Sequence, residues 1–152
     1  MNVKWVNPFV TSVNNVMKEI GFIDIETGTM NAKSQEITGN GVVLMLGIVG
    51  DLQGNIMYVI DEESAKKIIT KFMKGIPVPD LDSMAASSLS ELSGMLSVHV
   101  ATSYAQAGYN VELSPPSLMI GNNMRIMMNS NKVLSVIFKA SDVTVEVNIA
   151  IN

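Results

Sequence analysis

The chain has 152 residues, of which 47% are hydrophobic and 16% are charged, and its net charge at pH 7 is −4. These values are typical of one well-packed globular domain over residues 1–152 and exclude a disordered chain. The absence of cysteine excludes disulfides and thiol chemistry, and the acidic balance argues against a nucleic-acid partner. No apolar run is long enough to cross a membrane, and asparagines interrupt the apolar start. We therefore expect a cytoplasmic protein without a signal peptide or a membrane partner.

The first half of the sequence predicts a helix, three strands and a second, shorter helix. Asn7 and Pro8 favour a helix start with Asn7 as the cap, and Gly21 ends this helix. Asp61 caps the shorter helix, which Gly75 ends. Strands are expected over residues 22–30, 35–50 and 56–61.

The second half predicts one long helix followed by strands. Residues 76–82 contain two prolines and form an extended connector, after which Asp82 or Ser83 caps a helix that runs to Gly108. The last strand alternates apolar and polar residues, so we expect one buried face and one wet face, with Asn148 on the wet face. Strands are expected over residues 109–113, 117–121, 124–130, 132–140 and 143–151.

The two halves resemble each other. The first helix ends in "EIGFIDIE" and the long helix in "QAGYNVEL", and "TGNGVVLML" (residues 38–46) parallels "IGNNMRIMM" (residues 120–128). The predicted fold is α+β, with an antiparallel or mixed sheet of about six strands, long helices on one face and two pseudo-symmetric halves. The similar helix ends also have a simpler explanation that needs no repeat, because a glycine after a helix is common.

Most enzyme classes lack the side chains that they need. With one histidine and no cysteine the chain has no zinc-binding set, and we expect neither a metal nor another cofactor. His99 falls on the helical stripe of Leu92 and Leu96, so a buried or half-buried structural role is expected. The Gly-Asn-Gly stretch at 39–41 lacks the lysine and the helix start of a phosphate-binding loop, and a turn explains it better.

The long helix carries one carboxylate beside a glycine. Ser87, Glu91 and Gly94 are spaced by four and three residues, so they form one row on the helix. A glycine inside a helix costs roughly 1 kcal/mol relative to alanine, so its presence needs a reason. The sheet-facing stripe is apolar and comprises Leu89, Leu92, Leu96 and Val100. Taken alone, an exposed glutamate on a helix is ordinarily just solvated.

Nearly the whole chain resembles the CheX branch of the CheC/CheX/FliY phosphatases of bacterial chemotaxis. The resemblance rests on "VNPF", "GNGVVLMLGIVGDLQGNIMYVIDEESAKKI", "SELSGML", "QAGYNVELSPPSLMIG" and a hairpin after them, all in the family's order. It implies a sheet with long helices on one face and two pseudo-symmetric halves. It also implies removal of phosphate from the aspartyl-phosphate of CheY, a response regulator. The family motif is an Asp or Ser, three residues, a Glu, two residues and an Asn on one helix.

The resemblance assigns these roles by position and shows one departure. The leading Ser is Ser87, and the Glu, which is thought to pair with a lysine of the regulator, is Glu91. The Asn, whose amide orients the attacking water, should stand at residue 94, where this chain has Gly94. The expected phosphatase is therefore weak or inactive. Ser93 or Ser97 are alternative hydroxyl donors, with Ser93 rotated about 100° from the row and Ser97 one turn further on. A packing role for Gly94 is the other open alternative.

The first half offers no replacement for the missing amide. Matching Gly21 with Gly108 places Lys4 opposite Glu91 and Asn7 opposite Gly94, and Asn7 is expected to be a cap. Three hypotheses remain: a CheX-type aspartyl-phosphate phosphatase, a non-catalytic module that binds a CheY-like receiver domain, and a dimeric scaffold for an unrelated protein. Ser87, Glu91 and Ser97 are the predicted partner-binding residues. We also expect a homodimer joined through the apolar strands at 132–140 and 143–152.

Overall fold

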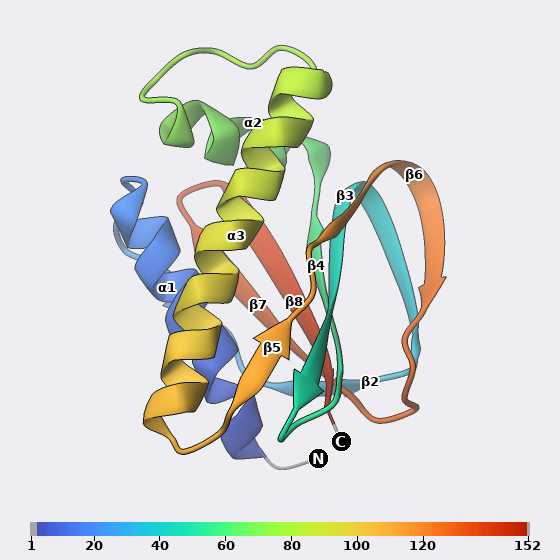
Figure 1. The fold of residues 1–152 in the computed structure, drawn as a ribbon. Coiled ribbons are helices and arrows are strands. Elements are labelled where there is room, and N and C mark those ends of the chain that lie inside the picture. Colours follow the sequence, from blue (N-terminus) through green and yellow to red (C-terminus); the bar gives the residue numbers. More distant parts are fainter. Residues whose placement is uncertain (1–2, 152) are drawn as a thin grey trace.

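Three α-helices cover one face of an eight-stranded antiparallel sheet in the computed structural model, which describes residues 3–151 (Figure 1). The helices are α1 (Asn7–Glu19), α2 (Glu62–Phe72) and α3 (Ser83–Gln106), and a 3-10 turn at Val3–Trp5 precedes α1. The strands are β1 (Glu26–Thr27), β2 (Asn31–Lys33), β3 (Glu36–Gly50), β4 (Gly54–Ile60), β5 (Val111–Leu113), β6 (Ser117–Met127), β7 (Val133–Ala140) and β8 (Val143–Ile151). The α+β fold predicted from the sequence is confirmed.

The strand order reads the same from both edges once the two halves of the chain are matched. It is β1-β7-β8-β4-β3-β5, with β2 also paired to β7 and β6 also paired to β3. Outward from the centre, β8 matches β4, β7 matches β3, and β1 and β2 match β5 and β6. Each half begins with a helix, α1 or α3, that is followed by a glycine of positive φ, Gly21 or Gly108. The predicted pseudo-symmetric halves are confirmed.

The predicted alignment of residues 38–46 with residues 120–128 is wrong, because the topology matches β3 with β7 and not with β6. The segments 117–121 and 124–130 also form one strand, β6, which pairs with β3, so β6 and β7 make no hairpin. The Gly-Asn-Gly stretch is a bulge inside β3 and not a turn. Asn40 Oδ1 accepts the backbone N–H of Asn123 at 2.7 Å, and the positive φ of Asn123 lets β6 continue opposite the bulge.

Two predictions near the amino terminus are also wrong. The 3-10 turn runs directly into α1, so Val6 is the cap and Asn7 is the first helical residue. The carbonyl of Val6 accepts the N–H groups of Phe9 and Val10, which leaves no capping role for the Asn7 side chain. Residues 22–30 give only the two-residue β1, because Asp24 has a left-handed backbone conformation.

α1 and α3 pack against each other in opposite directions between the sheet and solvent (Figure 1). At one end, the Tyr104 hydroxyl of α3 donates to the carbonyl of Trp5, and the Tyr104 ring meets the Phe9 ring edge-on at 5.9 Å. Further along, His99 Nε2 lies 3.1 Å from Oε1 of Glu19, the last residue of α1. The start of α1 therefore lies beside the end of α3.

The face of the sheet away from the helices is partly covered, contrary to the alternation predicted for the last strand. Asn148 is fully buried there, and its amide nitrogen donates to Glu146 Oε2 at 3.1 Å. The sheet curls, and the segments that enter β3 and leave β6 pair there, since the N–H of Met128 donates to the carbonyl of Gln35. Curling forms a second small core of Ile37, Val43, Met57, Met128, Val133 and Ala150.

The strands predicted to lie at an exposed edge are paired on both sides. β8 lies between β7 and β4, and β7 lies between β8 and the short β1 and β2. The long strand with one unpaired edge is instead β6, which pairs with β3 alone among the described strands. Among the described strands, β6 therefore offers the longest free edge for a sheet-to-sheet contact, since the other edge strands, β1, β2 and β5, have two or three residues each.

Candidate functional site

A capped helix start places the predicted row on the outer face of α3. Asp82 is the cap, since its Oδ1 accepts the N–H of Ala85 at 2.9 Å. From this start the apolar stripe faces the sheet, with Leu89, Leu92 and Val100 buried. Ser87, Glu91 and Gly94 are consequently exposed on the opposite side. The three residues predicted to form a row therefore lie together on the solvent-exposed side of α3.

Glu91 is the only carboxylate on α3 and is fully available to a partner. Its side chain is exposed, and no lysine, arginine or histidine of residues 3–151 forms an ion pair with it. An exposed, unpaired carboxylate on a helix face retains its hydration in the free protein. A cation from another molecule could pair with it without breaking an internal contact.

Open space surrounds Gly94. A Cβ atom built on this residue would have no neighbouring atom within 4 Å, apart from the atoms of its own helix. Its backbone is helical, with no positive φ that would require glycine. The packing interpretation of Gly94 is therefore wrong within the described chain, because no element of residues 3–151 approaches closely enough to need a missing side chain. The outer face of α3 is therefore open beside Glu91, and we call the place of the missing side chain the gap at Gly94.

The two serines considered as replacements lie off the exposed row. Ser93 is fully buried and its Oγ has no hydrogen-bond partner among the described residues, so it points into the core. Ser97 is half-buried. Neither hydroxyl projects into the gap at Gly94 as an asparagine amide at that position would.

Asn7, the counterpart of Gly94 in the first half, lies far from Glu91. Asn7 is exposed on α1, and the start of α1 contacts Tyr104 near the end of α3. Tyr104 lies more than three helical turns beyond Glu91, or roughly 20 Å along the axis. Asn7 and Glu91 of one chain therefore cannot contact the same phosphoryl group.

Two exposed apolar side chains on the same row were missed in the sequence. Met84 is 56% exposed and Val98 is 67% exposed. Met84 precedes Ser87 by three residues, and Val98 follows Gly94 by four, so both continue the row at its ends. The sequence spacing places both residues on the row, but it does not show that they are exposed, because that depends on which elements cover α3.

The sequence and the fold of this chain both match known proteins. The sequence model of the family "Chemotaxis phosphatase CheX" matches residues 42–139 of the chain. The chain belongs to the CheX family. It is 27% identical over 126 residues, or 83% of this chain and 81% of the other, to the CheY-P phosphatase CheX of Thermotoga maritima.

Solved structures share the CheX fold over nearly the whole chain. A CheC-like superfamily protein from Shewanella sp. PV-4 superposes with a TM-score of 0.88 at 24% identity, covering 100% of this chain and 99% of the other. A chain from the CheX–CheY–BeF3–Mg²⁺ complex of Borrelia burgdorferi superposes with a TM-score of 0.82 at 28% identity, covering 97% of each chain. The first likeness concerns the fold alone, while the second is also detectable in the sequence, at 28% identity.

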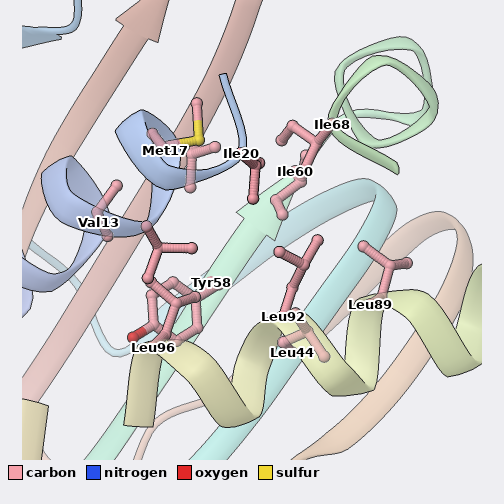
Figure 2. A pocket seen from close by; sticks show the side chains of 12 residues that line it. Val13, Met17, Ile20, Leu44, Tyr58, Ile60, Ile68, Leu89, Leu92 and Leu96 are labelled. Atoms are coloured by element: carbon pink, nitrogen blue, oxygen red, sulfur yellow. The ribbon is translucent and has the colours of Figure 1, made fainter. Parts of the chain in front are cut away.

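An apolar pocket lies between the helices and the sheet of this CheX-family chain, on the inner side of α3 and not at the candidate row (Figure 2). Its volume is about 40 Å³, and no charged side chain lines it. Burial raises the pKa of the Tyr58 hydroxyl in its wall, so this group stays protonated. Its wall comprises Val13, Val16, Met17, Ile20, Leu44, Tyr58, Ile60, Ile68, Leu89, Leu92, Leu96 and Val145. We interpret the pocket as imperfect core packing without chemistry of its own.

Three further features of the described chain concern metal binding, membrane-spanning helices and the surroundings of its histidine. Among residues 3–151, no group of three or more His, Cys, Asp or Glu side chains is arranged to hold a metal ion. In the same part of the chain, no helix is long and apolar enough to span a membrane. His99, expected to be structural, is half-buried and contacts Glu19 across the two helices rather than facing the row.

The open space at Gly94 predicts that Gly94→Asn is structurally tolerated. Asparagine is no worse than glycine inside a helix, and exposed substitutions usually change stability by less than about 0.5 kcal/mol. Urea denaturation should give a free energy of unfolding within that range of the unsubstituted chain. Gly41→Asn is the matched control and should unfold far more readily, because its Cβ would lie 2.5 Å from the backbone nitrogen of Glu62. A clear loss of stability in Gly94→Asn would contradict the open site.

Proposed function

We propose that this CheX-family chain binds the phosphorylated receiver domain of a CheY-like response regulator through the outer face of α3, and hydrolyses its aspartyl-phosphate weakly or not at all. Family membership and the CheX–CheY complex of a relative support the choice of partner. The observation that carries the proposal is Gly94, which is exposed and surrounded by open space beside an unpaired Glu91.

Binding and hydrolysis depend on different side chains, so the loss of one amide affects hydrolysis more than binding. Hydrolysis requires a water oxygen to attack phosphorus in line, while the bond from phosphorus to the aspartate oxygen breaks and a carboxylate leaves. Positioning that water is the main service that a protein can provide. Glu91 retains the charge that a basic partner group can meet, whereas Gly94 has no group that could hold the water. Binding should therefore persist without efficient hydrolysis.

The proposal predicts a gain of activity in Gly94→Asn. The phosphorylated receiver should decay about 10²–10³ times faster with this variant than with the unsubstituted chain, because a single positioned hydrogen-bonding group is worth that much in other enzymes. The measurement is the loss of phosphate from a labelled receiver at saturating concentrations of each protein. Gly94→Ala is the control, since it fills the gap without an amide, and it should leave the rate unchanged.

Two outcomes of this assay would contradict the proposal. A fully active unsubstituted chain would mean that another group, such as the Ser97 hydroxyl, positions the water. A Gly94→Asn variant that folds and binds but gains no rate would mean that more than the amide is missing.

Removal of the Glu91 carboxylate should weaken binding and leave folding intact. Glu91→Ala loses an ion pair at the partner interface, and such losses reduce affinity by about tenfold or more. Its melting temperature should stay nearly unchanged, because Glu91 makes no internal ion pair in the described chain. Glu112→Ala, at an exposed carboxylate on β5, is the control and should bind normally. An unfolded Glu91→Ala variant would make Glu91 structural.

We also propose that the protein forms a homodimer, joined along the free edge of β6. This strand pairs with β3 on one side only, and Ile120 is an exposed apolar residue on it. Unprotected edges of this kind pair readily with a second chain. Light scattering at micromolar concentration should give twice the 16.4 kDa of one chain, and Ile120→Lys should reduce it to a monomer. A monomeric mass for the unsubstituted chain would contradict this proposal. So would a dimer that Ile120→Lys leaves intact but that the control Ile137→Lys on β7 breaks.

A further inference from the structure

α3 has too few charges for a helix with a solvent-exposed face. Its 24 residues contain a single carboxylate and no lysine or arginine, whereas the 11 residues of α2 carry five charged side chains. Exposed surfaces normally carry charges at about a quarter to a third of their positions. Exposed apolar side chains on a helix face that has almost no charge, here Met84 and Val98, indicate a surface that another molecule covers. The sheet covers the inner face, and nothing in the described chain covers the outer face at the row.

The uncovered face is a defined strip. Met84, Ser87, Glu91, Gly94 and Val98 follow one another at spacings of three or four residues, which places them in one row roughly 21 Å long. Apolar side chains stand at both ends of the strip, and small or absent side chains stand on either side of Glu91. A partner surface could therefore approach the middle of the helix closely while its apolar groups meet Met84 and Val98.

We infer that Met84 and Val98 are apolar contacts for the activated receiver domain, so that the interface extends beyond the Ser87–Gly94 row at both ends. The inference rests on the proposed function and identifies which additional residues hold its partner. The partner is a receiver domain with a basic group opposite Glu91, because this carboxylate has no ion pair in the described chain. The strip is also continuous with the candidate site, and a relative 28% identical in sequence is found in a complex with CheY.

The test measures binding of a receiver activated with beryllofluoride and Mg²⁺ to the full chain and its variants. Val98→Thr keeps the shape and the helix propensity of valine but buries a hydroxyl in the interface, which should weaken binding about tenfold. Met84→Gln should weaken binding by a similar factor. Val49→Thr is the matched control, because Val49 on β3 is 55% exposed and lies outside the strip, and it should bind like the unsubstituted chain. Circular dichroism should confirm that all three variants are folded.

Three outcomes would overturn the inference, and they separate it from the proposed function. If Glu91→Ala weakens binding while Val98→Thr and Met84→Gln do not, the inference fails and the proposed function stands. If the unsubstituted chain does not bind the activated receiver, both fail. If Val98→Thr or Met84→Gln lowers the molecular mass of the free protein in light scattering, the strip is covered by a second copy and not by the receiver.

Discussion

The pairing of β4 with β8 is the interaction on which the rest of the structure depends. Residues Gly54–Ile60 and Val145–Ile151 form the centre of the sheet and join the two halves of the chain. The strands approach so closely at one end that a Cβ on Gly54 would lie 1.9 Å from the carbonyl oxygen of Ala150. Because each half brings its own helix, this pairing places α1 beside α3 and leaves each helix with one face toward solvent.

Pseudo-symmetry also explains why the two halves cannot share a site. The antiparallel arrangement puts the start of α1 beside the end of α3, so matching positions lie at opposite ends of the helix pair. One half presents Glu91 beside the gap at Gly94, and the other presents Asn7 with Lys4 in place of the carboxylate. The separation of roughly 20 Å keeps the carboxylate of one half and the amide of the other apart. In the proposed function, a single face of α3 therefore carries binding without the means of hydrolysis.

Local features of the fold could be predicted from the sequence, whereas features that depend on distant segments could not. Periodicity and the caps at Asp61 and Asp82 identified α2 and α3, since these signals lie within a few residues. The continuity of β6 and the burial of Asn148 depend on how the sheet curls, which no local pattern encodes. The spacing predicted the row on α3, but whether Gly94 faced open space or a neighbour depended on the packing of the whole domain.

The central claim is that the outer face of α3 meets the receiver, and NMR shift mapping tests it most directly. The chain, at 16.4 kDa, is small enough for amide spectra with and without a receiver activated by beryllofluoride. The account predicts that the largest shift changes fall on Met84, Ser87, Glu91, Gly94 and Val98, with little change at Asn7 on α1. Changes concentrated on α1 or on β6, with α3 unaffected, would contradict it.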